Sequence, residues 1–151
     1  MRIALGSDHA GFAAKEALKA RLRSLGHEVE DLGCAGPESC DYPDFVIPAA
    51  EAVASGRCER GFVLGGSGNG EAMAANKVGG IRAAVVTDAF TAEMARRHND
   101  AQVASFGARV LSEERILELA GIFLGTPFDG GRHLARVEKI AAYERKAAGG
   151  A

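Results

Sequence analysis

The sequence predicts an α/β fold in which a parallel sheet of about five strands carries helices on both faces. Short apolar segments alternate with longer segments of helical period along the whole chain, and this alternation is typical of parallel sheets covered by helices. At the centre, the apolar run 62–65 leads through a glycine-rich loop into an alanine-rich segment, the pattern of strand, tight turn and helix. No repeat, linker or low-complexity tract interrupts the sequence, so we expect residues 1–151 to form one domain.

The first half of the chain is expected to hold two strands, two helices and one irregular segment. Ile3 and Leu5 alternate in the opening strand, and leucines recur at helical spacing before Gly26 ends the first helix. Pro48 is tolerable only near the start of the second helix. In order, the elements are a strand at 2–6, a helix at 12–25, a strand at 29–32, an irregular segment at 33–43 and a helix at 45–54.

The second half repeats the same alternation. Thr87 or Asp88 is expected to cap one helix and Ser112 another, because hydroxyl and carboxylate side chains accept the free N–H groups of a first helical turn. The elements are strands at 62–65, 81–86 and 103–106, helices at 72–77, 88–97, 113–124 and 132–146, and a turn at 126–131. Residues 146–151 are expected to be a frayed end.

Composition excludes several classes of partner. The formal charge of −2 gives no reason to expect nucleic acid or an anionic membrane surface. No apolar run approaches the roughly 18 residues of a membrane span, and the first five residues read as a strand and not as a signal peptide. Three cysteines, none in a CxxC pair, cannot all be paired within the chain. They favour a reducing cytoplasm, and we expect no metal site.

The glycine-rich loop is the strongest single indication of function. The peptide N–H groups of a helix's first turn favour an anion, and glycines at 65, 66, 68 and 70 allow close approach. Glu71 follows in the same turn, where a loop that only bound phosphate would more naturally present Lys or Ser/Thr. An anion cradle beside a carboxylate suggests a site that stabilises an oxyanion while a base removes a proton.

Other polar residues follow the ends of predicted strands. Ligands in open parallel sheets bind beyond the carboxyl ends of the strands, and this rule brings together Asp8, His9, Ser67, Glu71, Thr87 and Asp88. Each also has a simpler explanation, since an Asp after a strand often caps the next helix and a Glu near a helix start favours the dipole.

Further basic residues near helix ends allow two interpretations. His98 and Asn99 end a helix, where a cation is favourable in any case. Arg132 and Arg136 are four residues apart, so they share a helical face that can bind a phosphate or simply face solvent. We expect His27 and His133 to be surface residues without a role.

Taken together, these motifs resemble the type B ribose-5-phosphate isomerases, a family that also includes the galactose-6-phosphate isomerase subunits. The resemblance covers the chain from the first strand to about Tyr143. The segments that carry it are Gly6-Ser7-Asp8-His9-Ala10-Gly11, Asp41-Tyr42-Pro43, Gly65 to Glu71, Ala74-Ala75-Asn76-Lys77, Gly80-Ile81-Arg82-Ala83, His98-Asn99, Phe106-Gly107-Ala108-Arg109 and Gly130-Gly131-Arg132-His133.

The resemblance implies a Rossmann-like three-layer αβα sandwich and a metal-free, cofactor-free aldose–ketose isomerase. It implies a homodimer with active sites at the subunit interface. Asp8 and His98 match a ring-opening pair, with His98 and Asn99 supplied by the neighbouring subunit. His9, Arg132 and Arg136 match phosphate contacts, joined by Arg109 from the partner.

The resemblance also assigns the glycine loop. Its amides, with Gly66, Gly68, Asn69 and Gly70, match the anion hole for an enediolate, and Ser67 matches a hydroxyl that assists proton transfer. Many members carry a cysteine base where this chain has Gly65. A second branch uses a glutamate at the position of Glu71, which is the pattern here, and none of the three cysteines matches the cysteine base.

Sequence alone would allow the phosphate to lie on the glycine loop. We follow the resemblance and place it on the arginines, because Glu71 would repel a dianion. The reaction expected is the interconversion of ribose 5-phosphate and ribulose 5-phosphate. The alternatives are a tetrulose 4-phosphate, allose 6-phosphate or galactose 6-phosphate, with residues 33–42 as one determinant of the choice. Two alternatives belong to other functional classes. They are a non-catalytic phosphate- or nucleotide-binding module and a structural oligomerisation domain.

Overall fold

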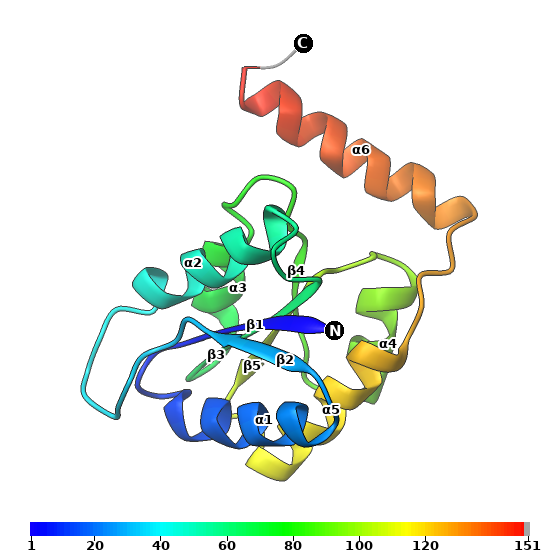
Figure 1. The fold of residues 1–151 in the computed structure, drawn as a ribbon. Coiled ribbons are helices and arrows are strands. Elements are labelled where there is room, and N and C mark those ends of the chain that lie inside the picture. The colour runs from blue at the N-terminus through cyan, green and yellow to red at the C-terminus, as the bar shows by residue number, and fades with distance from the viewer. Residues whose placement is uncertain (150–151) are drawn as a thin grey trace.

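Five parallel strands form the centre of the molecule, in the order β2-β1-β3-β5-β4. A computed structural model describes residues 1–149. The strands are β1 (Arg2–Ser7), β2 (Glu28–Asp31), β3 (Arg60–Gly65), β4 (Ala83–Val85) and β5 (Val103–Gly107). The fully parallel sheet confirms the predicted α/β class (Figure 1).

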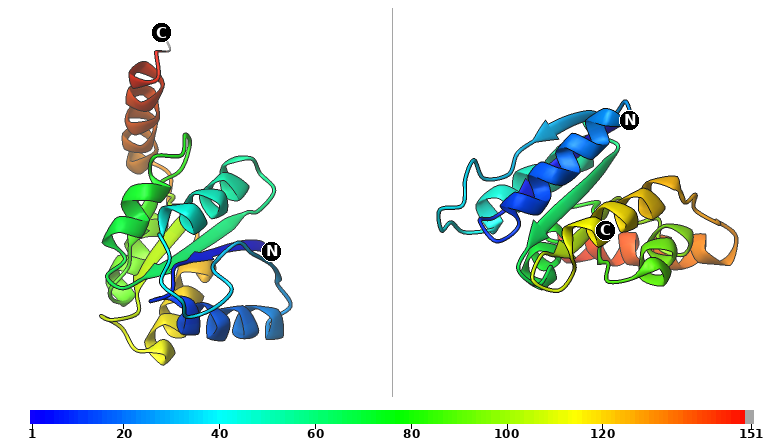
Figure 2. Two further views of the ribbon diagram at one scale, coloured as in Figure 1. Left: turned by 90° about the vertical axis from the view of Figure 1, so that its left-hand side faces the viewer. Right: turned by 90° about the horizontal axis from the view of Figure 1, so that it is seen from below.

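Helices cover both faces of this sheet and complete a three-layer sandwich (Figures 1 and 2). One face packs against α1 (Phe12–Ser24), α4 (Ala89–Arg97) and α5 (Glu113–Gly125), with Phe62, Phe106 and Phe123 in contact at its centre. The other face packs against α2 (Pro43–Ala54) and α3 (Asn69–Ala75) through small and β-branched side chains. Since both faces are buried, β1, β3 and β5 consist largely of buried residues.

The element boundaries differ from the sequence prediction by one to three residues, most visibly in α2, α3 and β4. The helix α2 begins at Pro43, so Pro48 lies inside it and not near its start. The helix α3 begins at Asn69, three residues earlier than expected, and Glu71 lies in its first turn as predicted. The strand β4 has three residues where six were predicted. Just before and at its start, the amides of Arg82 and Ala83 donate to the side chains of Gln102 and Asn76.

The last helix, α6 (Arg132–Ala147), leaves the sandwich and projects away from it (Figures 1 and 2). One contact back to the body is the amide of Gly80, which donates to Glu144 Oε2 at 2.9 Å. The predicted frayed end at 146–151 is wrong for Lys146 and Ala147, which are helical. Residues 150–151 lie outside the described part of the chain.

The strand order determines where a ligand can bind. Since β1 has β2 on one side and β3 on the other, the chain changes direction across the sheet between β1 and β3. The loops after these two strands therefore border the crevice in which open α/β sheets bind ligands. The loops are residues 8–11 and 66–68.

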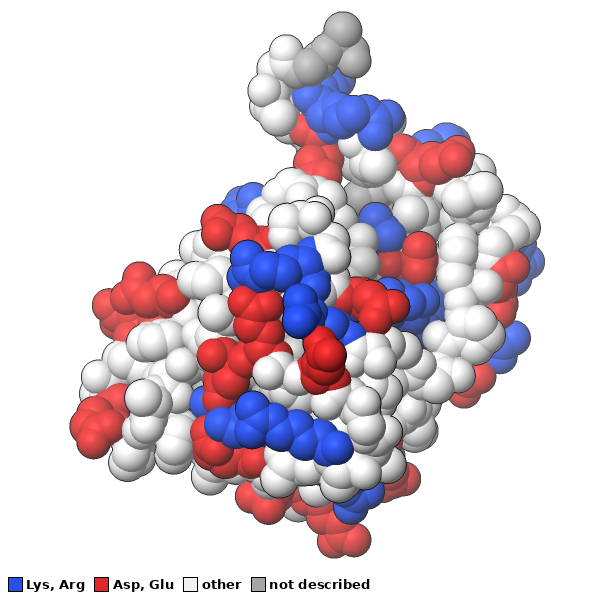
Figure 3. Space-filling model, viewed as in Figure 1, with Lys and Arg blue, Asp and Glu red and all other residues white. Residues whose placement is uncertain are grey.

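The outer surface carries both signs of charge. Acidic and basic side chains are interspersed on the face seen in Figure 3. Within residues 1–149, none of the helices has the length and apolar character needed to cross a membrane.

Candidate active site

Asp8 follows β1 and closes the turn that leads into α1. Its Oδ1 accepts the amides of Ala10 at 2.9 Å and Gly11 at 3.2 Å, and the side chain is buried. Asp8 therefore caps the turn before α1, which was one of the two roles that the sequence allowed for it. The same carboxylate also acts electrostatically on Glu71, raising the pKa of that carboxyl.

The glycine-rich loop after β3 is held in place by the end of β5. Gly68 has a φ of +85°, a conformation that favours glycine. Its carbonyl accepts the Ser105 hydroxyl at 2.7 Å. Gly107 lies so close to the loop that a Cβ there would be 2.5 Å from the Ser67 carbonyl oxygen. The exposed Ser67 hydroxyl accepts the amide of Asn69 at 3.1 Å and so lies over the first turn of α3.

Glu71 points back under this loop and is 4% exposed. A Cβ on Gly65 would overlap the Glu71 carboxylate. The Glu71 side chain therefore fills the space that the side chain of any other residue at position 65 would need. Its Oε2 finds no hydrogen-bond partner among the described residues. Burial raises the pKa of Glu71 and the charge of Asp8 adds to this, whereas the amides of Glu71 and Gly68 lower it. Burial is the largest of these effects, so the pKa of Glu71 lies above its ordinary value.

Tyr42 and Arg109 border the loop, and His9 follows Asp8 in the turn after β1. His9 is half-buried, and its Nδ1 accepts the amide of Cys40 at 3.2 Å. The Tyr42 ring covers Gly70, where a Cβ would lie 2.6 Å from the ring. Arg109 Nη1 lies 3.3 Å from the position of a Cβ on Gly66 of the same chain. Tyr42 was not among the predicted site residues, although the Asp41-Tyr42-Pro43 motif contained it.

A second group of predicted residues gathers where α4 ends and α6 begins. His98 caps α4 and stacks on His133, with ring centroids 4.1 Å apart and an angle of 10° between the planes. Arg132 and Arg136 are exposed on the first turns of α6. The expectation that His133 is a surface residue was wrong, because its contact with His98 leaves it only 9% exposed. Burial, His98 and the two arginines lower the pKa of His133.

The donor atoms of His98, Asp129 and His133 lie within 4.8 Å of one another, but the arrangement suits a metal ion poorly. Imidazole binds a metal in its ring plane, and two parallel rings cannot both face one ion. The Asp129 carboxylate already accepts Arg97 Nε at 3.2 Å. Since Arg132 and Arg136 add positive charge, this group is better suited to an anion.

Two further predicted residues have structural roles. Asp88 accepts the amide of Thr91 at 2.7 Å, and the Thr91 hydroxyl accepts the amides of Thr87 and Asp88, which together cap α4. Asn99 is exposed beside His98, and its carbonyl accepts Arg82 Nε at 2.8 Å.

Within one chain, the predicted residues therefore form two groups. The loop after β1 and the start of α6 lie on opposite sides of the molecule (Figure 1). The first group holds Asp8, His9, Ser67, Glu71 and Arg109, and the second holds His98, Asn99, Arg132 and Arg136. A single chain does not bring His9 together with the two α6 arginines. Arg109 lies beside Gly66 of its own chain, and its expected contribution to a partner's site stays a prediction.

Comparison with known proteins tests the family resemblance. A sequence profile of the Ribose/Galactose Isomerase family matches residues 3–140. The solved structure of ribose-5-phosphate isomerase B from Clostridium thermocellum superimposes with a TM-score of 0.96. It has 48% sequence identity and covers 97% of this chain and 99% of that one.

Two curated relatives extend the comparison. Ribose-5-phosphate isomerase B from Escherichia coli is 41% identical over 96% of this chain and 97% of its own. D-erythrulose-4-phosphate isomerase from Pectobacterium atrosepticum is 39% identical over 97% of both chains. The family profile, these identities and the shared fold confirm the resemblance predicted from the motifs: the chain belongs to the ribose/galactose isomerase family.

Proposed function

We propose that this chain is an aldose–ketose isomerase that interconverts ribose 5-phosphate and ribulose 5-phosphate through an enediolate. The observation that carries the proposal is the buried carboxylate of Glu71, whose Oε2 has no hydrogen-bond partner among the described residues, beneath a glycine-rich loop at the crevice between β1 and β3. Relatives named for ribose 5-phosphate cover nearly the whole chain. Residues 1–151 act as one isomerase domain that needs no cofactor or metal.

Glu71 is the base that moves the carbon-bound proton. It takes the proton from C2 of the opened aldose and returns it to C1, so no proton is lost overall. A raised pKa suits this role, because a base works best when its pKa lies closer to the working pH. The oxyanion that develops faces the amides of Gly66, Gly68 and Gly70, and each well-placed donor is worth about 2.7–4 kcal/mol. The Ser67 hydroxyl passes the proton between O1 and O2.

Ring opening and phosphate binding need residues of both groups. Asp8 and His98 exchange protons with the ring oxygen and the anomeric hydroxyl. His9, Asn99, Arg109, Arg132 and Arg136 bind the rest of the substrate, and the arginines bind its phosphate as charge-assisted donors.

Since one chain holds these residues in two separate groups, we propose a homodimer in which each active site takes one group from each subunit. The projecting α6 supports this arrangement. Its side chains Leu134, Ile140 and Tyr143 are large, apolar and exposed, and such surfaces often bind another protein. The symmetric pairing of two copies would let α6 of each chain reach the crevice of the other. We place the dimer in the cytoplasm because thiols persist in a reducing compartment and all three cysteines, within the described residues, are free.

A four-carbon substrate is the second candidate. The relative named D-erythrulose-4-phosphate isomerase is nearly as similar as those named for ribose 5-phosphate. The six-carbon substrates allose 6-phosphate and galactose 6-phosphate remain alternatives of the same class. A non-catalytic phosphate- or nucleotide-binding module, or a purely structural oligomerisation domain, would leave the buried carboxylate of Glu71 without a purpose.

The test is an isomerase assay of the purified protein with each sugar phosphate in turn. We expect the highest kcat/KM with ribose 5-phosphate and none of the activity to depend on added metal. A higher kcat/KM with D-erythrulose 4-phosphate would make the four-carbon reading correct. Inactivity with all four substrates, together with thermal stabilisation by a nucleotide, would favour the binding module.

A further inference from the structure

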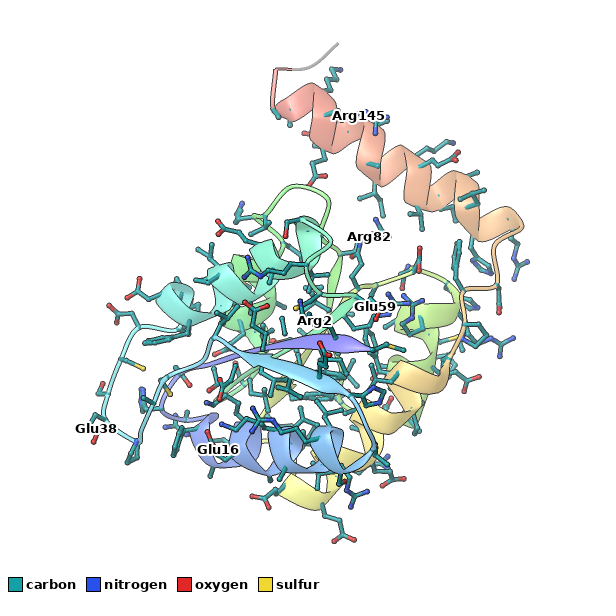
Figure 4. All side chains as sticks on the ribbon, in the orientation of Figure 1. Arg2, Glu16, Glu38, Glu59, Arg82 and Arg145 are labelled. Atoms are coloured by element: carbon teal, nitrogen blue, oxygen red, sulfur yellow. The ribbon has the colours of Figure 1, made fainter. Side chains whose placement is uncertain are left out.

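Residues 33–42 lie beside the crevice and contact His9. The segment connects β2 to α2 and loops outward, and Figure 4 shows Glu38 at its outer edge. One end is joined to β1 by the Cys34 amide, which donates to the Ser7 carbonyl at 3.0 Å. At the other end, the Tyr42 ring covers Gly70. Between them, the Cys40 amide donates to His9 Nδ1 at 3.2 Å.

This last contact determines where His9 carries its proton. A main-chain N–H can only donate, so Nδ1 must hold a lone pair for the hydrogen bond to exist. In a neutral imidazole the single proton is then on Nε2. The contact also fixes the plane of the ring. His9 therefore presents an Nε2–H donor in one orientation.

A buried lysine anchors the segment that makes this contact. Lys15 is 1% exposed, and its Nζ donates to the Cys34 carbonyl at 3.0 Å and to both Asp31 oxygens at 2.8 and 2.9 Å. A buried ammonium is stable only when it is paired and fully hydrogen-bonded. Moving the Cys34 carbonyl would remove one of its partners, so Lys15 holds the start of the segment in place.

We propose that Cys40 is a positioning residue whose main-chain N–H fixes His9 as an Nε2–H donor, and that Lys15 holds in place the segment that carries it. The consequence for catalysis rests on the proposed function, in which that donor faces the substrate phosphate. The tautomer itself does not rest on it. The cysteine thiol takes no part, so its replacement by serine keeps the contact, whereas proline removes the N–H.

The first experiment measures the tautomer directly. Long-range ¹H–¹⁵N correlation spectra of ¹⁵N-histidine-labelled protein distinguish Nδ1–H from Nε2–H, and His9→Gln identifies the His9 signals by their loss. At a pH above the range in which imidazole is protonated, wild type and Cys40→Ser should show a single Nε2–H tautomer. Cys40→Pro should show averaged tautomers and raise the KM for ribose 5-phosphate about two- to ten-fold, the loss expected for one hydrogen bond.

The second experiment tests the anchor and does not depend on proline being tolerated. Lys15→Met removes the donor to the Cys34 carbonyl, while Asp31 keeps Lys19 at 2.7 Å. Lys19→Met is the matched control, because Lys19 contacts Asp31 and Glu16 but, within residues 1–149, makes no hydrogen bond to Cys34. We expect tautomer averaging in Lys15→Met and the wild-type spectrum in Lys19→Met.

Three results would overturn the proposal. They are an Nδ1–H or averaged tautomer in wild type, an unchanged spectrum in folded Cys40→Pro, and identical spectra for the two lysine variants. A protein that is inactive with every sugar phosphate but keeps the single Nε2–H tautomer would instead overturn the proposed function and leave the role of Cys40 standing.

Discussion

At the scale of single residues, Gly65 and Glu71 occupy one shared volume. A Cβ at 65 would overlap the Glu71 carboxylate, so the chain has room for a side chain at 65 or a buried carboxylate at 71, but not both. This gives a steric reason for the two patterns that the family resemblance implies, a cysteine at the first position or a glutamate at the second. Under the proposed function, either residue would place a base beneath the same loop.

The shared volume leads to a test by exchange of the base. Glu71→Ala should be nearly inactive, and adding Gly65→Cys should restore part of the activity because a thiolate then occupies the vacated space. Gly65→Ala with Glu71→Ala is the control that fills the space without a base. In the Glu71 background, Gly65→Cys should destabilise the protein through overpacking by about 1–3 kcal/mol. Equal activity of the two double variants in the isomerase assay would refute the exchange.

Glu71 should also make stability depend on pH in a direction that can be worked out. Burial raises its folded-state pKa above the unfolded value. As pH rises through the interval between the two values, the unfolded chain loses its proton first, so the free energy of unfolding falls. Glu71→Gln removes this effect. Its gain in urea stability over wild type should be larger at about pH 8 than at about pH 4.

The exposed Glu138→Gln is the matched control for that measurement. It should leave the difference between the two pH values unchanged. A Glu71→Gln gain that is the same at both pH values would mean that the carboxyl is not destabilised by burial.

How much of the site the sequence could predict depends on how far apart along the chain the contacting residues lie. Asp8, Ser67 and Glu71 follow strands, and the rule for strand ends places them without further information. His133 was misplaced because its burial depends on a ring 35 positions earlier, at His98. Tyr42 was missed for the same reason, since nothing local indicates that its ring covers Gly70. Pairings between distant positions leave no periodic trace in a sequence.

At the scale of elements, glycine is required at one position and unfavourable at another. Gly107 ends β5 against the glycine loop, where a Cβ would lie 2.5 Å from the Ser67 carbonyl oxygen. Gly121 lies on the exposed side of α5, where no atom of the described residues is within 4 Å of a Cβ. Close approach of two backbones requires glycine at the first position, whereas helix propensity disfavours it at the second.

Alanine substitutions should therefore have opposite signs. Gly121→Ala should raise the free energy of unfolding by about 0.5–1 kcal/mol. Gly107→Ala should lower it by about 1–3 kcal/mol and reduce kcat as well, because the loop must shift. Urea titrations of the two variants and wild type provide the measurement. A neutral Gly107→Ala would show that β5 does not hold the loop.

Elements with strong local signals were predicted best. The helix α5 begins after Ser112, whose side chain accepts the amide of Arg115 as the cap predicted. The strand β4 was predicted too long. The apolar pattern assigns the amides of Arg82 and Ala83 to hydrogen bonds with a neighbouring strand, but they donate to the side chains of Gln102 and Asn76. The start of α3 was predicted too late. The glycine-rich pattern typical of a turn continues to Gly70, which already lies inside the helix.

At the scale of the whole molecule, the two groups of site residues and the projecting α6 point to a shared site. Each group alone lacks something that the reaction needs. The first has Glu71, the proposed carbon base, but not the α6 arginines, and the second has the arginines but not Glu71. A second copy of the chain supplies the missing half without any change of fold.

Mixing inactive variants tests the shared site. Asp8→Asn and His98→Ala alter different groups, so a mixed dimer has one intact site. After subunit exchange, an equal mixture should recover about a quarter of wild-type activity, since about half of the dimers are mixed and each has one of two sites intact. Asp8→Asn mixed with Glu71→Gln should recover nothing, because both alter the first group. Mixed dimers seen by native mass spectrometry without recovery in the first mixture would contradict the shared site.

The central claim is that Glu71 moves the carbon-bound proton of a sugar phosphate, and isotope exchange tests it most directly. Ribose 5-phosphate is incubated in D₂O with wild type, Glu71→Gln or Glu138→Gln, and deuterium at C2 is followed by NMR. Wild type and Glu138→Gln should exchange the C2 proton during isomerisation. Glu71→Gln should lose this exchange and about 10²–10⁴-fold in kcat, while it still binds the sugar phosphate. C2 exchange at a near wild-type rate in Glu71→Gln would contradict the account.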